Sequence, residues 1–176
     1  NIILNFFRRV KKNNFKSLKL PKFDKAFDDR CKKNYWYKIK KKPDVIIFEG
    51  WCVGARPQKN SMLKKTINSL EKTDDPNLIW RKHVNDQLKT KYKKLFSYLD
   101  CLLYMKAKNF GLLQKWRLKQ EKKLWIKSKN KKNLKLMSRG DVINFMQTYQ
   151  RITQNMFEDA PKYASIIIKL NSNHQI

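Results

Sequence analysis

The sequence predicts an α/β fold that is rich in helix and contains a short parallel sheet. Short, largely apolar runs occur at 45–48, 99–105 and 164–170. Runs without polar alternation are typical of strands covered on both faces, as in parallel sheets. Segments with apolar residues at helical spacing separate these runs, so helices alternate with strands along the chain.

The amino-terminal quarter predicts one helix, one loop and one strand. Apolar residues recur at helical spacing over 2–19, and Pro21 ends that pattern. A polar loop that carries acidic residues follows at 22–33. The four apolar residues 45–48, mostly β-branched, are the clearest strand in the sequence, and the Glu49-Gly50 pair ends it.

The middle of the chain predicts two helices before the second strand. The first covers 60–71. The second covers 78–95, where apolar residues recur at helical spacing. Asp74 or Asp75 is the expected N-cap, with Pro76 at or near the first helical position.

The carboxyl-terminal part predicts two longer helices before the third strand. Apolar residues at helical spacing predict a helix over 110–127, which a loop rich in Lys and Asn interrupts at Ser128. Ser138 is the expected cap of the next helix, with Asp141 three residues later as the partner in a capping box.

Composition restricts the class of protein. The chain has 42 Lys and Arg residues against 14 Asp and Glu residues, a formal net charge of +28. Because 34 of the basic residues are Lys and they are spread over the whole length, a solvated surface explains them better than nucleic acid or an anionic small substrate does. The 22 aromatic residues argue against disorder, and no apolar run is long enough to cross a membrane.

The cysteines indicate a cellular compartment, and the first residues indicate how the sequence begins. Cys31, Cys52 and Cys101 show neither a CxxC spacing nor a Cys/His ligand spacing, which favours a reducing, cytoplasmic compartment. The apolar residues at the start precede Arg8 and Arg9, the wrong order for a secretory signal. Since the sequence does not begin with Met, we expect it to start within a longer protein.

Three groups of residues have the composition of a functional site. The loop that ends at Arg30 carries three carboxylates, Glu49 ends the predicted strand next to two glycines, and Arg117 lies one helical turn before Glu121. Ligands of parallel sheets bind where the strands end, so Glu49 is expected to point into a crevice. A solvated loop, a simple turn and an ordinary surface ion pair are the alternative interpretations.

Several segments, in this order, resemble one protein family. They are 20–30, 44–57, Val84–Leu88 with Tyr92, Trp116–Glu121, Met137–Ser138 and 145–153. Together they resemble the D-glycerate 3-kinase group of P-loop kinases. Tyr149–Thr153 is similar to a Tyr-Glu-Arg-Leu-Thr segment of the bacterial branch, with Gln150 in place of the acid.

The resemblance implies a kinase that transfers a phosphoryl group from ATP, with Mg²⁺, to a small hydroxy acid such as D-glycerate. It implies an incomplete P-loop NTPase fold of three layers, like that of the mononucleotide kinases. The implied catalytic residues are Asp24, Glu49 and Arg117, and Asp24 and Glu49 are also the implied metal ligands. The implied substrate-binding residues are Asp28, Asp29, Arg30, Arg56 and Arg151, and the implied cofactor-binding residues are Gln120 and Glu121.

One departure from the family is large. Such kinases bind nucleotide phosphates with a GxxxxGK[ST] loop, but none of the four glycines in this sequence is followed by Lys. We therefore expect 1–176 to be the carboxyl-terminal portion of one kinase domain, with a lid-like helical region at about 106–140. We expect such a fragment to be poorly stable, with weak or no affinity for ATP.

Two alternatives to the kinase interpretation stay open. One is a non-catalytic basic module that binds nucleic acid or a partner protein. The other is a subunit that finds its missing half in another chain.

Overall fold

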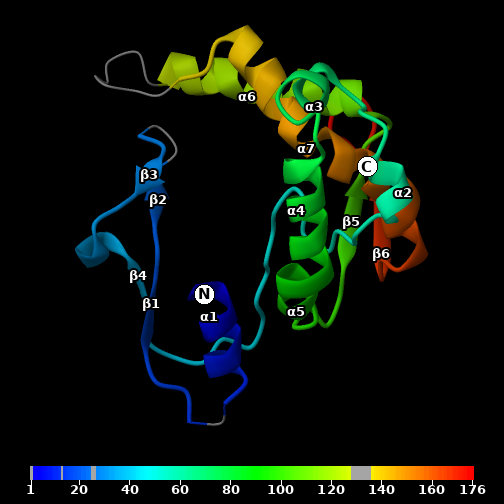
Figure 1. Cartoon of the computed structure of the whole chain (residues 1–176). Helices are drawn as coiled ribbons and strands as arrows, with labels where there is room; N and C mark the ends of the chain where they lie inside the picture. Colours follow the sequence, from blue (N-terminus) through cyan, green and yellow to red (C-terminus); the bar gives the residue numbers. More distant parts are fainter. Residues whose placement is uncertain (1, 13, 25–26, 128–135) are drawn as a thin grey trace. The chain divides into compact units, whose positions relative to one another are not determined.

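The computed structural model describes residues 2–12, 14–24, 27–127 and 136–176, which fall into two compact units (Figure 1). Unit 1 consists of Asn1–Glu49 and Glu121–Leu136. Unit 2 consists of Gly50–Gln120 and Met137–Ile176. The chain is helix-rich and contains one short parallel sheet, as the sequence predicts.

The described residues up to Glu49 give unit 1 a helix and two small antiparallel ribbons. Helix α1 covers Ile2–Val10. The first ribbon pairs β1 (Leu18–Leu20) with β4 (Tyr37–Ile39), and the second pairs β2 (Phe23–Asp24) with β3 (Asp29–Arg30). A single 3₁₀ turn, η1, covers Lys33–Tyr35.

Two predictions for unit 1 are therefore wrong in their boundaries. The helix expected over 2–19 ends at Val10, and Leu18–Leu20 form a strand that pairs with Tyr37–Ile39. The loop expected over 22–33 contains the β2–β3 hairpin. A turn at Asp28, with φ +53°, joins the two strands.

The strand predicted at 45–48 is not a strand. The segment has no regular secondary structure and pairs with no strand in the described part of the chain, and Val45 and Ile47 are 78% and 86% exposed. A strand requires a neighbour whose amides and carbonyls complete its hydrogen bonds, and no described strand supplies one. The apolar side chains of this segment instead border an open cavity of about 720 Å³ in unit 1.

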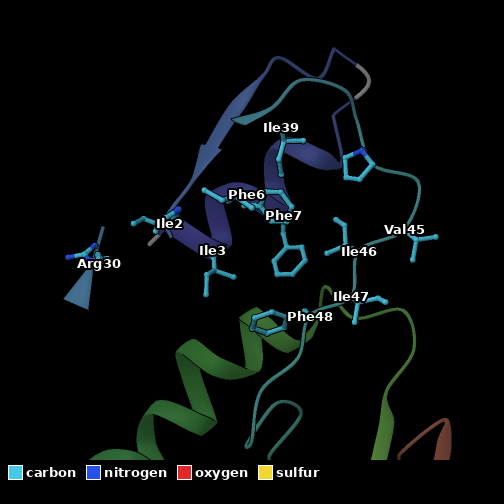
Figure 2. A pocket seen from close by; sticks show the side chains of 13 residues that line it. Ile2, Ile3, Phe6, Phe7, Arg30, Ile39, Val45, Ile46, Ile47 and Phe48 are labelled. Carbon is cyan, nitrogen blue, oxygen red and sulfur yellow. The ribbon is translucent and has the colours of Figure 1, made fainter. Parts of the chain in front are cut away.

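Figure 2 shows this cavity, which helix α1 and residues 45–48 border. Phe7 and Phe48 meet there edge to face, with ring centroids 5.7 Å apart. Among the described residues that line it, Arg30 is the one charged side chain, and the others are apolar.

The sheet of unit 2 is parallel and has two strands. β5 (Leu103–Lys106) pairs with β6 (Ile166–Lys169), with Leu103 opposite Ile166. Both strands lie within the runs predicted at 99–105 and 164–170, apart from the last residue of β5. The prediction of burial on both faces is wrong, because Leu103 and Ile166 are 46% and 49% exposed.

Short helices precede the first strand of unit 2. The helix predicted over 60–71 is two helices, α2 (Asn60–Leu63) and α3 (Ser69–Thr73). The interruption has a local cause: Asn68 is the N-cap of α3, and its side chain accepts a hydrogen bond from the Glu71 amide.

The helix predicted over 78–95 is confirmed as three continuous parts. They are α4 (Ile79–Gln87), the π-helical turn η2 (Leu88–Tyr92) and α5 (Lys93–Phe96). Neither Asp74 nor Asp75 is its N-cap, because Leu78 occupies that position, with φ +66°. Asp75 nevertheless caps the helix from three residues upstream, where its side chain accepts hydrogen bonds from the amides of Trp80 and Arg81.

Two longer helices complete the fold. α6 covers Phe110–Lys127, as predicted, and belongs to unit 2 up to Gln120 and to unit 1 from Glu121. α7 covers Arg139–Asp159 and begins with the predicted capping box of Ser138 and Asp141. A 3₁₀ turn, η3 (Ala160–Lys162), follows it. The loop predicted at Ser128 lies outside the described residues.

Two apolar clusters form the core of unit 2, and α7 contributes to both. One joins Ala55, Leu88, Met156 and Ala160. The other joins Phe110, Val142 and Met146. None of the described helices has the length and apolar composition that crossing a bilayer requires.

Candidate functional site

A cavity of about 290 Å³ lies in unit 2 where α3, α4 and α7 meet the segment 56–58. Its polar lining includes three arginines, two carboxylates and several amides, and its apolar lining includes Leu63, Leu70 and Ile152. Arg56 and Arg151, both predicted to bind substrate, are among the lining residues. The structure thus brings together two predicted residues that are far apart in the sequence.

Glu71 of α3 is the centre of an ion-pair network beside this cavity. It is 6% exposed, and its two carboxylate oxygens accept hydrogen bonds from Nε and Nη2 of Arg151 at 2.7 and 2.6 Å. Arg151 also donates to the carbonyls of Met62 and Lys65, at 3.0 and 2.6 Å. These contacts give Arg151 a structural role, since they tie α7 to α2 and α3; its binding of a substrate stays a prediction.

Arg81 of α4 is the second buried arginine and was not predicted from the sequence. Its Nη1 atom donates to the backbone carbonyls of Glu71 and Asp75 and lies 3.4 Å from a carboxylate oxygen of Asp75. In the sequence, the only indication of a role for Arg81 is that it follows Asp75 by six residues near the predicted start of a helix. That spacing occurs often by chance, so a single sequence does not distinguish it.

The pKa of Asp75 is lowered in this environment. Burial by itself raises the pKa of a carboxyl group. At Asp75 the hydrogen bonds from the amides of Trp80 and Arg81, together with the charge of Arg81, outweigh that effect. Asp75 therefore stays ionised and balances the charge of Arg81.

Arg56 differs from the other two arginines because it is exposed. Its guanidinium carbon lies 3.5 Å from the centre of the Tyr163 ring, and the Tyr163 hydroxyl donates to the carbonyl of Gly54. Burial is the main cause that raises the pKa of Tyr163, which keeps the hydroxyl protonated as a donor. The ring is thus a fixed platform for Arg56.

Asn85 holds the segment that carries Arg56. Its side chain accepts from the Gln58 amide at 2.8 Å and donates to the Gln58 carbonyl at 3.0 Å. Asn85 belongs to Val84–Leu88, one of the segments that carry the family resemblance, and its side chain connects α4 to the segment 56–58. Two hydrogen bonds to one residue fix both the position and the direction of that backbone.

The predicted residues of α6 lie elsewhere. The Arg117 guanidinium is 5.8 Å from the centre of the Phe145 ring on α7. Gln120 is exposed, whereas Glu121 is 4% exposed. The roles of Arg117 at the phosphates and of Gln120 and Glu121 at the cofactor stay predictions.

Unit 1 contains the predicted carboxylates. Asp24 of β2 lies opposite Asp29 of β3, and Asp29 accepts a hydrogen bond from the Arg30 amide at 2.6 Å. Asp28, Asp29, Arg30 and Glu49 are exposed. The expectation that Glu49 ends a buried strand is wrong, since residues 45–48 form no strand.

Within the described residues, no three Asp, Glu, His or Cys side chains gather as a preformed metal site. Magnesium is usually held by one or two carboxylates, with water and substrate phosphates completing its ligands. Gly54 has φ +82°, but a Cβ there would lie 2.8 Å from the Leu102 side chain, so the glycine serves packing rather than a phosphate. Magnesium ligation by Asp24 and Glu49, and binding of ATP, stay predictions.

Comparison with curated proteins finds two kinases. The chain is 31% identical over 155 residues to the uncharacterized kinase Mug58 of Schizosaccharomyces pombe, a match that covers 85% of this chain and 52% of that protein. It is 26% identical over 108 residues to the chloroplastic D-glycerate 3-kinase of Arabidopsis thaliana, covering 59% of this chain and 21% of that protein. The chain thus spans about half of the first relative and about a fifth of the second. No protein-family model matches it.

Solved structures show the same relationship at the level of the fold. D-glycerate 3-kinase from Cryptococcus neoformans var. grubii matches with a TM-score of 0.73 at 20% identity, over 99% of this chain and 64% of that one. The protein YGR205w matches with a TM-score of 0.55 at 26% identity, over 98% of this chain and 61% of that one. The resemblance predicted from the sequence is confirmed: this chain is similar, in sequence and in fold, to a D-glycerate 3-kinase-like family.

Proposed function

We propose that this chain is the acceptor-binding part of a kinase that transfers a phosphoryl group from ATP to a small hydroxy acid such as D-glycerate. The observation that carries the proposal is the sequence similarity to an Arabidopsis D-glycerate 3-kinase together with a fold match over 99% of the chain. The basic cavity of unit 2 supports it, because a hydroxy acid is an anion at neutral pH.

The reaction depends mainly on positioning and on neutralising negative charge. The proposed roles are those that the family resemblance implies: Arg56, Arg151, Asp28, Asp29 and Arg30 act on the acid, and Asp24 accepts the proton of the attacking hydroxyl. Glu49 and Arg117 act on the phosphoryl group. ATP supplies the phosphoryl group, and Mg²⁺ neutralises its charge when bound.

The proposed fold is a P-loop NTPase fold of three layers, and the sequence of this chain contains no phosphate loop. We therefore expect the 176-residue chain alone to bind ATP in the millimolar range or not at all. Calorimetric titration of the chain with ATP and Mg²⁺ measures this. Micromolar affinity would show that a different segment binds the nucleotide.

A chimera tests the activity. This chain replaces the matched region of the Cryptococcus D-glycerate 3-kinase, and formation of ADP is followed with and without D-glycerate. We expect formation of ADP that depends on D-glycerate. A matched chimera with Glu49→Gln is expected to retain its fold, by circular dichroism, and to lose most of its turnover.

The experiment distinguishes failure of the proposed function from a wrong role for Glu49. A folded chimera that phosphorylates no hydroxy acid contradicts the proposed function. A Glu49→Gln chimera with unchanged turnover removes Glu49 from the reaction but leaves the function in place.

The high positive charge favours one competing function, binding of nucleic acid. An affinity of that origin falls steeply as salt increases, because it comes from the release of counterions. Titration with a single-stranded oligonucleotide at about 50 and 200 mM salt distinguishes this. Binding of the oligonucleotide that is tight at the lower salt and falls steeply at the higher salt would favour the basic-module alternative, whereas a kinase should show neither.

A further inference from the structure

The parallel sheet of unit 2 has one open face. Side chains alternate between the two faces of its strands, β5 and β6, which lie side by side (Figure 1). The residues of one face are Leu103, Met105, Ile166 and Ile168. The first three of these are 46%, 57% and 49% exposed. On the opposite face, Tyr104 packs against an apolar cluster of the core, so the sheet is covered on that side alone.

Strand β5 also has a free edge. Among the described strands, β6 is its one neighbour. The Lys106 carbonyl accepts a hydrogen bond from the Leu170 amide at 2.9 Å, so the even-numbered residues of β5 direct their backbone groups toward β6. Because these groups alternate in direction along a strand, those of Leu103 and Met105 point to the other edge, where no described strand meets them.

Such a sheet is incomplete by the standards of parallel sheets. Parallel sheets have both faces covered, and free edges are usually blocked by charged residues or by proline. β5 has no proline and one charged residue, Lys106, at its end. The open face and the free edge of β5 thus form one surface, the β5 surface, which is suited to a further strand with apolar side chains.

The comparisons indicate where such a strand comes from. The fold match extends over nearly the whole of this chain, so β5 and β6 belong to the shared fold. The same match covers about two thirds of the Cryptococcus kinase, and the sequence match covers about half of Mug58. Each relative therefore has a large part without a counterpart in these 176 residues.

We propose that the β5 surface docks an apolar strand from the part of the kinase that lies outside these 176 residues. The strand pairs with the backbone groups of Leu103 and Met105 and extends the sheet from two strands to three. A sheet requires about three strands with an apolar face for independent stability. The inference rests on the family resemblance and on the sheet, and it does not depend on which acid the kinase phosphorylates.

Hydrogen exchange resolved to single residues tests the inference on two proteins. They are the 176-residue chain and its chimera with the Cryptococcus kinase, which supplies the part that the chain does not match. We expect the amides of Leu103 and Met105 to exchange at least tenfold more slowly in the chimera than in the chain alone. The Leu170 amide is the internal control, because it already has an acceptor and should change less.

Two results overturn the inference. One is equally rapid exchange of the Leu103 and Met105 amides in the two folded proteins. The other is slow exchange of these amides in the chain alone, together with a dimer in analytical ultracentrifugation. A second copy of the chain would then occupy the β5 surface.

A charge placed on the β5 surface is an independent test. Lysine on an edge strand opposes pairing with a further strand. We therefore expect Met105→Lys to restore rapid exchange of the Leu103 amide in the chimera. Met62→Lys is the matched control, because it makes the same change on α2, where Met62 is 49% exposed. It should leave the slow exchange of the Leu103 amide unchanged.

The test stays decisive if the Met105→Lys chimera does not fold. Since Met105 is exposed in the chain alone, the Met105→Lys chain should unfold at the wild-type urea concentration. Failure of the chimera alone then supports the inference, whereas wild-type protection of Leu103 in a folded Met105→Lys chimera overturns it.

Failure of the proposed function gives a different result. In that case, exchange at Leu103 slows in the chimera, but no ADP forms in response to D-glycerate. Conversely, a chimera that phosphorylates D-glycerate while Leu103 and Met105 exchange as rapidly as in the chain alone overturns only the docking of the strand.

Discussion

Unit 2 buries several charged side chains, whereas unit 1 leaves large apolar side chains exposed to solvent. In unit 2, Glu71, Asp75 and Arg81 are at most 7% exposed and are paired with one another or with Arg151. In unit 1, Val45 and Ile47 are almost fully exposed. The comparison shows that the availability of partners, rather than residue type, decides which side chains are buried.

Removing the central carboxylate of unit 2 should have the largest effect. Glu71→Ala leaves the largely buried Arg151 guanidinium without its carboxylate partner, and we expect the free energy of unfolding to fall by about 3–5 kcal/mol. Urea unfolding measures this. The control is Lys82→Ala, which removes an exposed pair with Asp86 on α4 and should change stability by less than about 0.5 kcal/mol. Equal losses in the two variants would contradict the buried network.

A second change tests the packing around Gly54. Gly54→Val places a side chain where φ is +82° and where Leu102 already lies 2.8 Å from the Cβ position. We expect a loss of about 1–3 kcal/mol in the free energy of unfolding. Gly140→Ala is the matched control, because a Cβ there meets no atom closer than 3.7 Å. A stable Gly54→Val variant would show that the turn is not required.

Lowering the pH should reduce the free energy of unfolding of unit 2, because Asp75 becomes protonated. Because its pKa is lower in the folded protein than the ordinary value of about 3.9, the stabilisation is complete above that pH. It is lost as the pH falls through the lower pKa of the folded state. Urea unfolding at several pH values between about 5 and 2 measures this. Asp75→Asn should have a flatter profile, and an unchanged profile would contradict the role of Asp75.

The smallest effect is expected in unit 1. Ile47→Ser replaces a side chain that is 86% exposed, so the free energy of unfolding should change by less than about 0.5 kcal/mol. Leu63→Ala in unit 2, where Leu63 is 1% exposed, should cost about 2–5 kcal/mol. Hydrogen exchange adds a direct readout: amides of 45–48 should exchange rapidly, and those of α7 slowly. A large loss in Ile47→Ser would show that this segment has a buried partner.

Elements with local signals were predictable from the sequence. The bounds of α6 and the capping box of α7 follow from residues within a few positions of each other. The absence of a strand at 45–48 could not be predicted, because a strand depends on a neighbour elsewhere in the chain. For the same reason, the sequence could not show that Leu18–Leu20, within the helix expected over 2–19, pair with β4 instead.

The site was predictable only in part. Arg56 and Arg151 were named through the resemblance, and the structure places both at one cavity. Arg81, Glu71 and Asp75 were missed, since their importance comes from mutual burial that no spacing reveals. The sequence also could not show that the bonds of Arg151 to Glu71 and to two carbonyls occupy most of its donors.

The parallel pairing of β5 with β6 has a consequence for how the protein folds. The two strands are separated along the chain by α6 and α7, so the ladder from Leu103 opposite Ile166 onward joins distant parts of the sequence. Closing a long loop costs chain entropy before any contact compensates for it. We therefore expect the helices to form early and this ladder to form late, as the slow kinetic step of unit 2.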